Sequence, residues 1–298
     1  LVLWTYLAAR LWPVTVALWA LYTLAVEPRH TLSRWQGWVL AVLACLAVFA
    51  PLGAHFYLHP EDFLERAGQV LVFTQTPPAQ IPALSYRLVN TLGRLHATDP
   101  EAVGLEDFGR PEGFLERQIR RWTKQLKSSQ SREVPGIDDL AAKLAARIPE
   151  TQRTAIVHGD YRLDNVIVGR NGQNEYDVAA VVDWEMSTLG DPLTDIGLFC
   201  TYWAAMGSDA LIPMTLDADA PAPFPTTDDL ISSYADTSGL DMSDLPWYIG
   251  FGCFKLAVIL EGIYYRHTLG QTVGEGFAVI GDMVQPLVDR GLAHIEAQ

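Results

Sequence analysis

This chain has few cysteines and, over its first 123 residues, no lysine. The three cysteines, Cys45, Cys200 and Cys253, lie far apart in apolar runs, and their spacing fits neither a disulfide framework nor a zinc site. We therefore expect buried free thiols in a reducing compartment. The chain also has no internal repeat and no low-complexity tract, and with 49% hydrophobic residues it can bury a sizeable core.

Basic residues are scarce relative to acidic ones. The chain has 21 Lys and Arg against 35 Asp and Glu, a formal net charge of -14. Residues 1–82 are neutral, so the remainder carries the whole negative charge. A surface of this sign repels nucleic acid and anionic lipid, and we expect neither as a ligand. It would suit a cationic substrate, although a solvated charged face is the commoner explanation.

The most informative stretch spans residues 156–195. A short apolar strand, residues 154–157, precedes a polar turn over 158–165, and a second apolar run follows at 166–168. A further strand over 178–182 leads into an acidic triplet, and a Gly-Asp-Pro sequence then opens a helix. Polar groups are therefore expected on loops at two strand ends.

The polar residues of these loops suit phosphoryl transfer. Asp160 and Asn165 stand five positions apart, as the Asp and Asn of the protein kinase catalytic loop do. Arg162 follows two positions after Asp160, and Asp183 begins an Asp-Trp-Glu triplet where protein kinases have Asp-Phe-Gly. Transfer from a nucleotide needs a carboxylate beside the acceptor hydroxyl, oxygen ligands for Mg²⁺ and a cation for the moving phosphoryl group. The stretch offers all three.

The segments 158–165, 183–185 and 190–195 resemble those of the aminoglycoside phosphotransferase and choline kinase superfamily. The flanking segments 95–122 and 254–271 further resemble the kinase-like domains that are fused to, or encoded near, acyl-CoA dehydrogenases. Several separated motifs occur in the right order, so the resemblance is specific.

The resemblance covers about residues 82–298 and implies an α+β fold. Residues 81–298 would form a protein kinase-like large lobe, mostly helical, with short β-hairpins that carry the catalytic and metal loops. The implied activity is ATP- and Mg²⁺-dependent transfer to a hydroxyl of a small molecule, such as a hydroxyacyl-CoA or similar metabolite, in the cytoplasm and with a functional link to an acyl-CoA dehydrogenase. The alternative is a non-catalytic kinase-like binding module, tethered to a membrane through residues 1–58.

The resemblance also implies roles for the residues of the first loop. Asp160 would be the base or the hydroxyl-orienting residue. Arg162 would either neutralise charge on the transferred phosphoryl group or pair with Asp164. For His158 we favour a scaffold that fixes the loop over a proton carrier.

Asn165 and Asp183 would bind the nucleotide-associated Mg²⁺, because amide and carboxylate oxygens suit this hard cation. Glu185 is a weaker candidate for a second metal site. Asp191 and Asp195 are expected to brace the loop through backbone hydrogen bonds and a helix N-terminus.

Residues 1–80 lack what the family places there, a small β lobe with a nucleotide-covering loop and a strand lysine: the first lysine is Lys124, and no glycine-rich loop precedes it. Residues 1–26 contain one charge and residues 35–58 none, so a membrane hairpin is the literal interpretation. It is disfavoured, because the arginine-bearing loop between these runs would lie in the cytoplasm and leave the kinase-like part outside, away from ATP.

Three interpretations of residues 1–80 stay open, in order of preference: a misread or frameshifted start that replaces the small lobe, a membrane anchor, and a divergent lobe. The chain begins at Leu1 rather than Met, which indicates a fragment or processed form. We expect weak or absent turnover from the chain as given.

Apolar periodicity predicts helices over residues 84–97, 114–127, 137–148, 193–206, 228–235, 247–268 and 277–296. The helix over 247–268 is apolar nearly all round and is predicted to be a core helix. His96 is predicted to be a packed or capping residue. The basic cluster between Arg117 and Lys124 is either a solvated face or a site for substrate phosphate.

Overall fold

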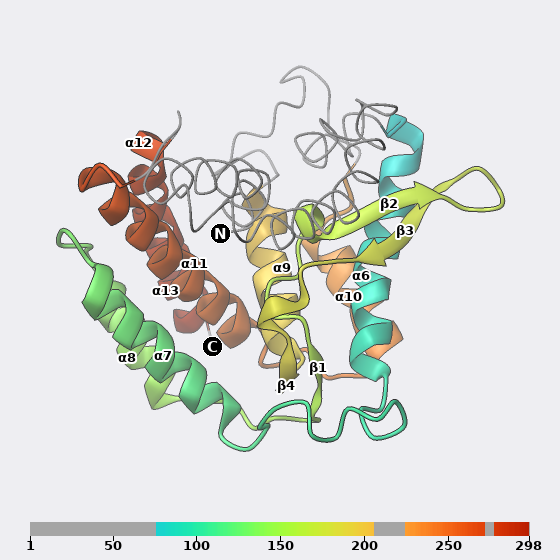
Figure 1. Ribbon diagram of the computed structural model, residues 1–298, viewed down its shortest axis with the longest axis horizontal. Helices are drawn as coiled ribbons and strands as arrows, with labels where there is room; N and C mark the ends of the chain where they lie inside the picture. The colour runs from blue at the N-terminus through green and yellow to red at the C-terminus, as the bar shows by residue number, and fades with distance from the viewer. Residues whose placement is uncertain (1–75, 206–223, 272–276, 298) are drawn as a thin grey trace, which may run out of the picture. The chain divides into compact units, whose positions relative to one another are not determined.

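The computed structural model describes residues 76–205, 224–271 and 277–297 (Figure 1). The predicted N-terminal segment, residues 1–80, falls almost wholly outside these ranges, and the apolar runs 1–26 and 35–58 and Cys45 lie outside them entirely. Everything below concerns the described residues.

Helices dominate this part of the chain. The α-helices are α6 (Ile81–Ala97), α7 (Phe114–Ser129), α8 (Ile137–Ala146), α9 (Leu193–Ala205), α10 (Thr227–Ser238), α11 (Leu245–Thr268), α12 (Phe277–Ile280) and α13 (Val284–Glu296). The strands are β1 (Ala155–Val157), β2 (Val166–Arg170), β3 (Tyr176–Val181) and β4 (Thr188–Gly190). Short 3-10 turns are η2 (Pro78–Gln80), η3 (Leu163–Asn165), η4 (Trp184–Met186) and η5 (Gly281–Met283). The predicted α+β fold class is confirmed.

Helix α11 is the centre of the helical packing. It contacts α13 and α9 most extensively and also touches α7 and α8 (Figure 1). Gly197 of α9 permits the close α9–α11 approach, since an added Cβ would lie 2.4 Å from the carbonyl oxygen of Tyr248. Helix α11 is the one described helix long and apolar enough to cross a membrane, but 78% of its apolar window is buried inside the protein. The prediction of a core helix is confirmed.

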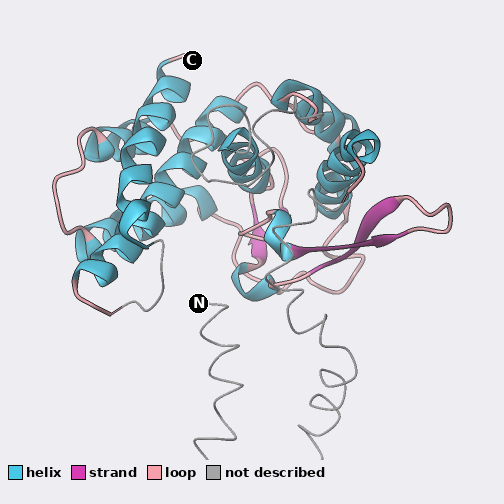
Figure 2. Cartoon of the chain, turned by 90° about the horizontal axis from the view of Figure 1, so that it is seen from above, coloured by secondary structure: helices cyan, strands magenta, loops and turns pink. Residues whose placement is uncertain are grey.

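Two antiparallel strand pairs carry the loops of interest. β1 pairs with β4, with Ala155 opposite Gly190, and β2 pairs with β3, with Val166 opposite Val181. The β2–β3 hairpin extends beyond the helices (Figure 2), while helix α6 contacts both β1 and β3. The turns η3 and η4 flank the open end of this hairpin, so the two predicted loops meet there.

Two elements differ from the sequence prediction. Strand β4 was not predicted, because three residues that include a glycine give no readable alternation. The single helix predicted over residues 277–296 is interrupted by the 3-10 turn η5, which begins at Gly281. An added Cβ at Gly281 would meet the ring of Tyr264 at 2.7 Å, so close packing against α11 accompanies the change in helix type.

The described cysteines are buried and free, as predicted. Burial raises the pKa of Cys200 to about 12 and that of Cys253 to about 11. Neither thiol is a thiolate at neutral pH, so neither suits a nucleophilic role.

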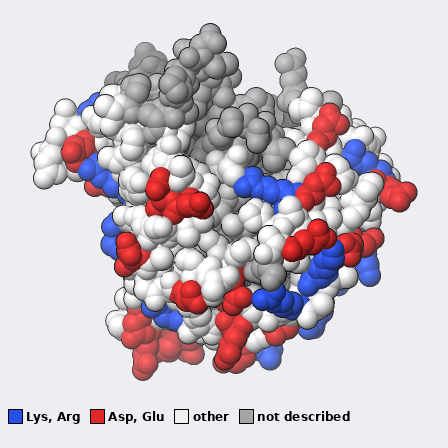
Figure 3. All heavy atoms as spheres, turned by 180° about the vertical axis from the view of Figure 1, so that it is seen from behind, with Lys and Arg blue, Asp and Glu red and all other residues white. Residues whose placement is uncertain are grey.

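Acidic and basic side chains are interspersed on the face shown in Figure 3, with acidic groups dense along its lower edge. The net negative charge of the chain therefore does not describe each local site. Charge complementarity with a ligand has to be sought at particular pockets.

Candidate active site

The loop after β1 is held from behind by a buried carboxylate. Asp195, 1% exposed in α9, accepts the backbone N–H groups of His158 at 2.6 Å and Gly159 at 2.8 Å. Burial alone would raise the pKa of Asp195, but hydrogen bonds from His96 and from the backbone outweigh it and hold the pKa below its usual value. The prediction that Asp195 braces this loop is confirmed.

A second buried chain of hydrogen bonds stands behind Asp195. His96, fully buried in α6, contacts Asp195 Oδ2 through Nε2 at 3.3 Å and the hydroxyl of Tyr234 through Nδ1 at 2.6 Å. Because a carboxylate only accepts, Nε2 carries the proton in this bond. His96 is packed, as predicted. Asp191, also predicted to brace the loop, accepts the Leu193 N–H at 3.0 Å and opens α9.

His158 uses both ring nitrogens on the backbone. Its Nδ1 accepts the N–H of Asp160 at 3.2 Å, and its Nε2 lies 3.0 Å from the carbonyl oxygen of Val182. The first contact requires a bare Nδ1, so Nε2 is the protonated nitrogen that donates to Val182. His158 thereby ties the first loop to the end of β3. This geometry favours the scaffold role over proton transfer.

Gly159 must be a glycine in this loop. Its φ is +83°, and an added Cβ would lie 2.7 Å from the carbonyl oxygen of Met186 in η4. Both the backbone conformation and the close approach exclude a side chain. The two loops therefore pack backbone against backbone at the residue before Asp160.

Asp160 lies at the front of the loop, with its side chain 28% exposed. The amide nitrogen of Asn165 donates to the backbone oxygen of Asp160 at 2.8 Å and to its Oδ2 at 3.0 Å. Burial raises the pKa of Asp160, and the nearby charges of Arg162 and Lys255 offset this only in part. A partly exposed carboxyl of raised pKa, fixed by an amide, is suited to accept or orient a hydroxyl proton.

Arg162 pairs with Asp164, one of the two predicted alternatives, and the phosphoryl-binding role stays a prediction. Its Nε lies 3.5 Å from Asp160 Oδ2, and its Nη1 lies 3.6 Å from Asp164 Oδ2. The guanidinium also lies 5.6 Å from the ring centre of Tyr202. The Nε proton is buried and makes no hydrogen bond among the described residues. Arg162 is thus placed next to Asp160, with its side chain 36% exposed.

Asn165 and Asp183 meet at the open end of the β2–β3 hairpin. Val182 donates its N–H to the backbone oxygen of Asn165 at 2.9 Å, directly before Asp183. With its NH₂ group bound to Asp160, Asn165 has its amide oxygen left to offer a cation. Asp183 adopts a left-handed conformation at φ +69°, one of two described non-glycine residues with positive φ. The backbone pairing places the two residues near each other, and amide and carboxylate oxygens are ligands that Mg²⁺ prefers.

Glu185 is placed differently. It is exposed in η4, and within the described ranges no hydrogen bond or ion pair joins it to Asn165 or Asp183. The described residues also hold no group of three His, Cys, Asp or Glu side chains close enough to bind an ion by themselves. A second metal site at Glu185 stays a prediction.

Sequence reasoning missed Lys255, which lies in the core helix α11. It is 8% exposed and donates from Nζ to the carbonyl oxygen of Gly159. Burial lowers the pKa of Lys255, while Asp160 and Asp195 act in the opposite direction. A lone lysine in an apolar helix was the available signal, since a buried charge needs partners.

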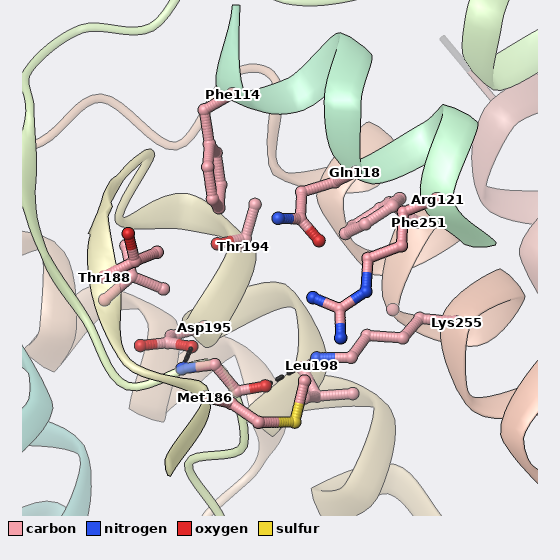
Figure 4. A pocket seen from close by; sticks show the side chains of 13 residues that line it. Phe114, Gln118, Arg121, Met186, Thr188, Thr194, Asp195, Leu198, Phe251 and Lys255 are labelled. Atoms are coloured by element: carbon pink, nitrogen blue, oxygen red, sulfur yellow. Dashed lines mark hydrogen bonds between the residues drawn. The ribbon is translucent and has the colours of Figure 1, made fainter. Parts of the chain in front are cut away.

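Lys255 borders a small pocket beside Gly159 (Figure 4). Arg121 and Gln118 of α7 point into it from the opposite wall, and Phe114 and Phe251 supply apolar sides. The basic residues of α7 therefore line two different pockets. Arg121 faces the catalytic loop, whereas Arg120, with Lys124, lines a different groove.

Comparison with known proteins places this geometry in a family. A model of the phosphotransferase enzyme family matches residues 30–228. The chain is 31% identical over 244 residues to acyl-CoA dehydrogenase family member 11 of Pongo abelii, which covers 81% of this chain and 31% of that protein. It is 33% identical over 196 residues to family member 10 of Mus musculus, covering 65% of this chain and 18% of that protein.

A solved structure supports the same fold. A protein of Ralstonia eutropha JMP134, assigned to the aminoglycoside phosphotransferases, superposes with a TM-score of 0.66 at 32% identity, over 77% of this chain and 69% of that one. This chain spans about a third of the length of the curated relative of Pongo abelii. The family match begins at residue 30, well before the motif-based limit near residue 82, because isolated motifs mark only the part of a family where the chemistry is concentrated.

Proposed function

Because the chain belongs to the phosphotransferase enzyme family, we propose that it transfers the γ-phosphoryl group of ATP to a hydroxyl of a small molecule. The observation that carries the proposal is the arrangement at Asp160: a partly exposed carboxyl, fixed by Asn165, beside Arg162 and next in the chain to Gly159, which lines a pocket. This is the set of groups that phosphoryl transfer requires at the acceptor side.

The proposed reaction assigns one task to each residue. The acceptor oxygen forms a bond to the γ-phosphorus, the bond from that phosphorus to the leaving ADP oxygen breaks, and the hydroxyl proton passes to the Asp160 carboxylate. Asn165 keeps that carboxylate in place, and Arg162 faces the charge on the phosphoryl oxygens. Asn165 and Asp183 would hold Mg²⁺, which when bound neutralises phosphate charge.

We propose an acyl compound, such as a hydroxyacyl thioester, as the acceptor. Support comes from the names of the relatives, which are acyl-CoA dehydrogenase family members. The same names support a functional link to such a dehydrogenase.

The test is product formation from labelled ATP with a panel of hydroxylated metabolites, followed by identification of the phosphorylated product. We expect Mg²⁺-dependent labelling of an acyl compound by residues 1–298, at a rate below roughly 1 per second, the lower end for kinases. The low rate follows from the absence of any lysine before Lys124. Equal labelling by the Asp160→Asn variant would contradict the proposal.

The same absence of an upstream lysine favours a second candidate, a non-catalytic kinase-like binding module. Calorimetry separates the two. Binding of an acyl compound without any binding of Mg²⁺·ATP, and without labelled product, would support the module and exclude the kinase.

A further inference from the structure

The pocket is lined by Gly159, the residue before Asp160, and by Lys255, whose charge acts on the Asp160 carboxyl. Its cavity volume is about 30 Å³, room for roughly two water molecules. The pocket is open to solvent on one side, so a compact polar group fits inside it while the rest of a ligand extends outward. The pocket is thus suited to a substituent that lies near the reacting hydroxyl.

Two cations approach this cavity from different helices. Lys255 comes from α11 and Arg121 from α7, and Figure 4 shows both side chains directed toward the same space. Gln118, one turn before Arg121 on α7, adds a neutral amide. Arg121 is a cause of the lowered pKa of Lys255, which means that the two positive charges repel each other.

The charge of Lys255 is already balanced. Its Nζ donates to the Gly159 carbonyl, lies 5.4 Å from the ring centre of Trp122, and is attracted by Asp160 and Asp195. Those carboxylates also have other partners. Asp195 accepts hydrogen bonds from the loop backbone, and Asp160 accepts one from Asn165 and pairs with Arg162.

The charge of Arg121 is not balanced in this way. Within residues 76–205, 224–271 and 277–297 its guanidinium makes no hydrogen bond and no ion pair, and it lies 5.4 Å from the ring centre of the adjacent Trp122. Arg121 is exposed, so its guanidinium is free to bind a ligand, and an electron-rich oxygen in the cavity would reduce the repulsion between Arg121 and Lys255.

We propose that Arg121, supported by Lys255 and Gln118, is the residue that selects the acceptor: it binds an acyl oxygen close to the reacting hydroxyl and excludes acceptors that carry a cationic group. The inference rests on the proposed function for the identity of the reacting hydroxyl. The two cations of the pocket favour an electron-rich group over the cationic substrate that the net charge of -14 would suit. The acyl oxygen belongs either to a free carboxylate or to a thioester carbonyl.

The experiment compares parent and Arg121→Gln with four probes of similar size: hydroxybutanoate, its thioester with N-acetylcysteamine, the corresponding butanediol, and ethanolamine. The substitution is expected to weaken kcat/KM for the acyl probes by roughly 10- to 100-fold, mainly through KM. The diol, which lacks the acyl oxygen, should be unaffected, and ethanolamine should become a better acceptor. The stronger of the two acyl effects identifies the source of the oxygen.

Arg120→Gln is the matched control. Arg120 precedes Arg121 on the same helix but lines the other groove, so its substitution changes the net charge equally without touching the cavity. An equal loss in both variants, or an equal loss for the diol and the acyl probes, would overturn the inference.

Equilibrium binding of the same probes, followed by thermal shift without ATP, separates this inference from the proposed function. Acyl probes could bind the parent, and bind Arg121→Gln more weakly, without any probe being phosphorylated. That result would support the acyl-binding subsite and contradict the proposed kinase activity. If no acyl probe binds the parent, or if Arg121→Gln binds them as well as the parent does, the subsite is excluded whatever the turnover.

Discussion

The two sides of the 158–165 loop are built in opposite ways. Behind it, Asp195 and His96 are almost fully buried and every identified polar contact is internal. In front of it, Asp160 and Arg162 are about one-third exposed, and their mutual contact is a loose 3.5 Å. The buried side contributes stability because its groups lose partners when any one is removed, while the front keeps groups available for a ligand. Substitutions on the two sides should therefore separate folding from activity.

The largest effect is expected from Asp195→Ala. It leaves two backbone N–H groups and His96 without their carboxylate, and removal of one partner from a buried charged network costs about 3–5 kcal/mol. Urea unfolding measures this. Asp164→Ala is the control, because Asp164 is 41% exposed on the same loop and should change stability by less than about 0.5 kcal/mol. Similar losses of unfolding free energy in both variants would contradict the difference in stability contribution between the buried and the exposed side of the loop.

Asp160→Asn should lower activity and leave stability unchanged. We expect the phosphoryl transfer rate to fall by about 100-fold or more, since proton acceptance is lost. Stability at pH 7 should not fall, because the raised pKa of Asp160 means that the folded environment disfavours its charged form. Thermal unfolding and labelled-ATP turnover are measured on the same preparation. A variant that loses stability along with activity would make Asp160 a structural residue.

Asp183 tests the metal end of the loop pair. Asp183→Gly and Asp183→Ala should both lose Mg²⁺-dependent nucleotide binding in calorimetry. The alanine variant should be less stable than the glycine variant by about 1 kcal/mol, because alanine is strained at a φ of +69°. Retained Mg²⁺-dependent binding in both variants would remove Asp183 from the metal site.

The smallest effect concerns the pH profile. Asp160 acts as a base only when deprotonated, so its raised pKa moves the acid limb of kcat/KM to higher pH than an ordinary Asp would give. The charge of Arg162 lowers the pKa of Asp160, so Arg162→Gln should move that limb to still higher pH. Arg170→Gln, at the exposed end of β2, is the control and should leave the limb in place. A shift to lower pH in Arg162→Gln would contradict the electrostatic assignment.

The sequence could predict what rests on periodicity and spacing. Helices such as α6 and α11 bury a regular apolar pattern, and the five-residue interval between Asp160 and Asn165 is local enough to read directly. Both residues indeed lie together, joined by a hydrogen bond of 3.0 Å.

What could not be predicted depends on contacts between distant segments. Lys255 reaches Gly159 across 96 positions, and nothing in the apolar pattern of α11 indicates its direction. Arg120 and Arg121 are neighbours in sequence, yet they line different cavities, because successive helical residues point about 100° apart. Which of them serves the site depends on how α7 packs against α11.

The hydrogen bonds that hold the loop backbone to Asp195 have a consequence for amide hydrogen exchange. Loop amides usually exchange with solvent through small local openings. The amides of His158 and Gly159 can open only if a fully buried carboxylate loses its donors, so their exchange should require nearly global unfolding. Two loop amides beside the proposed catalytic residue should therefore exchange as slowly as those of the core helix α11.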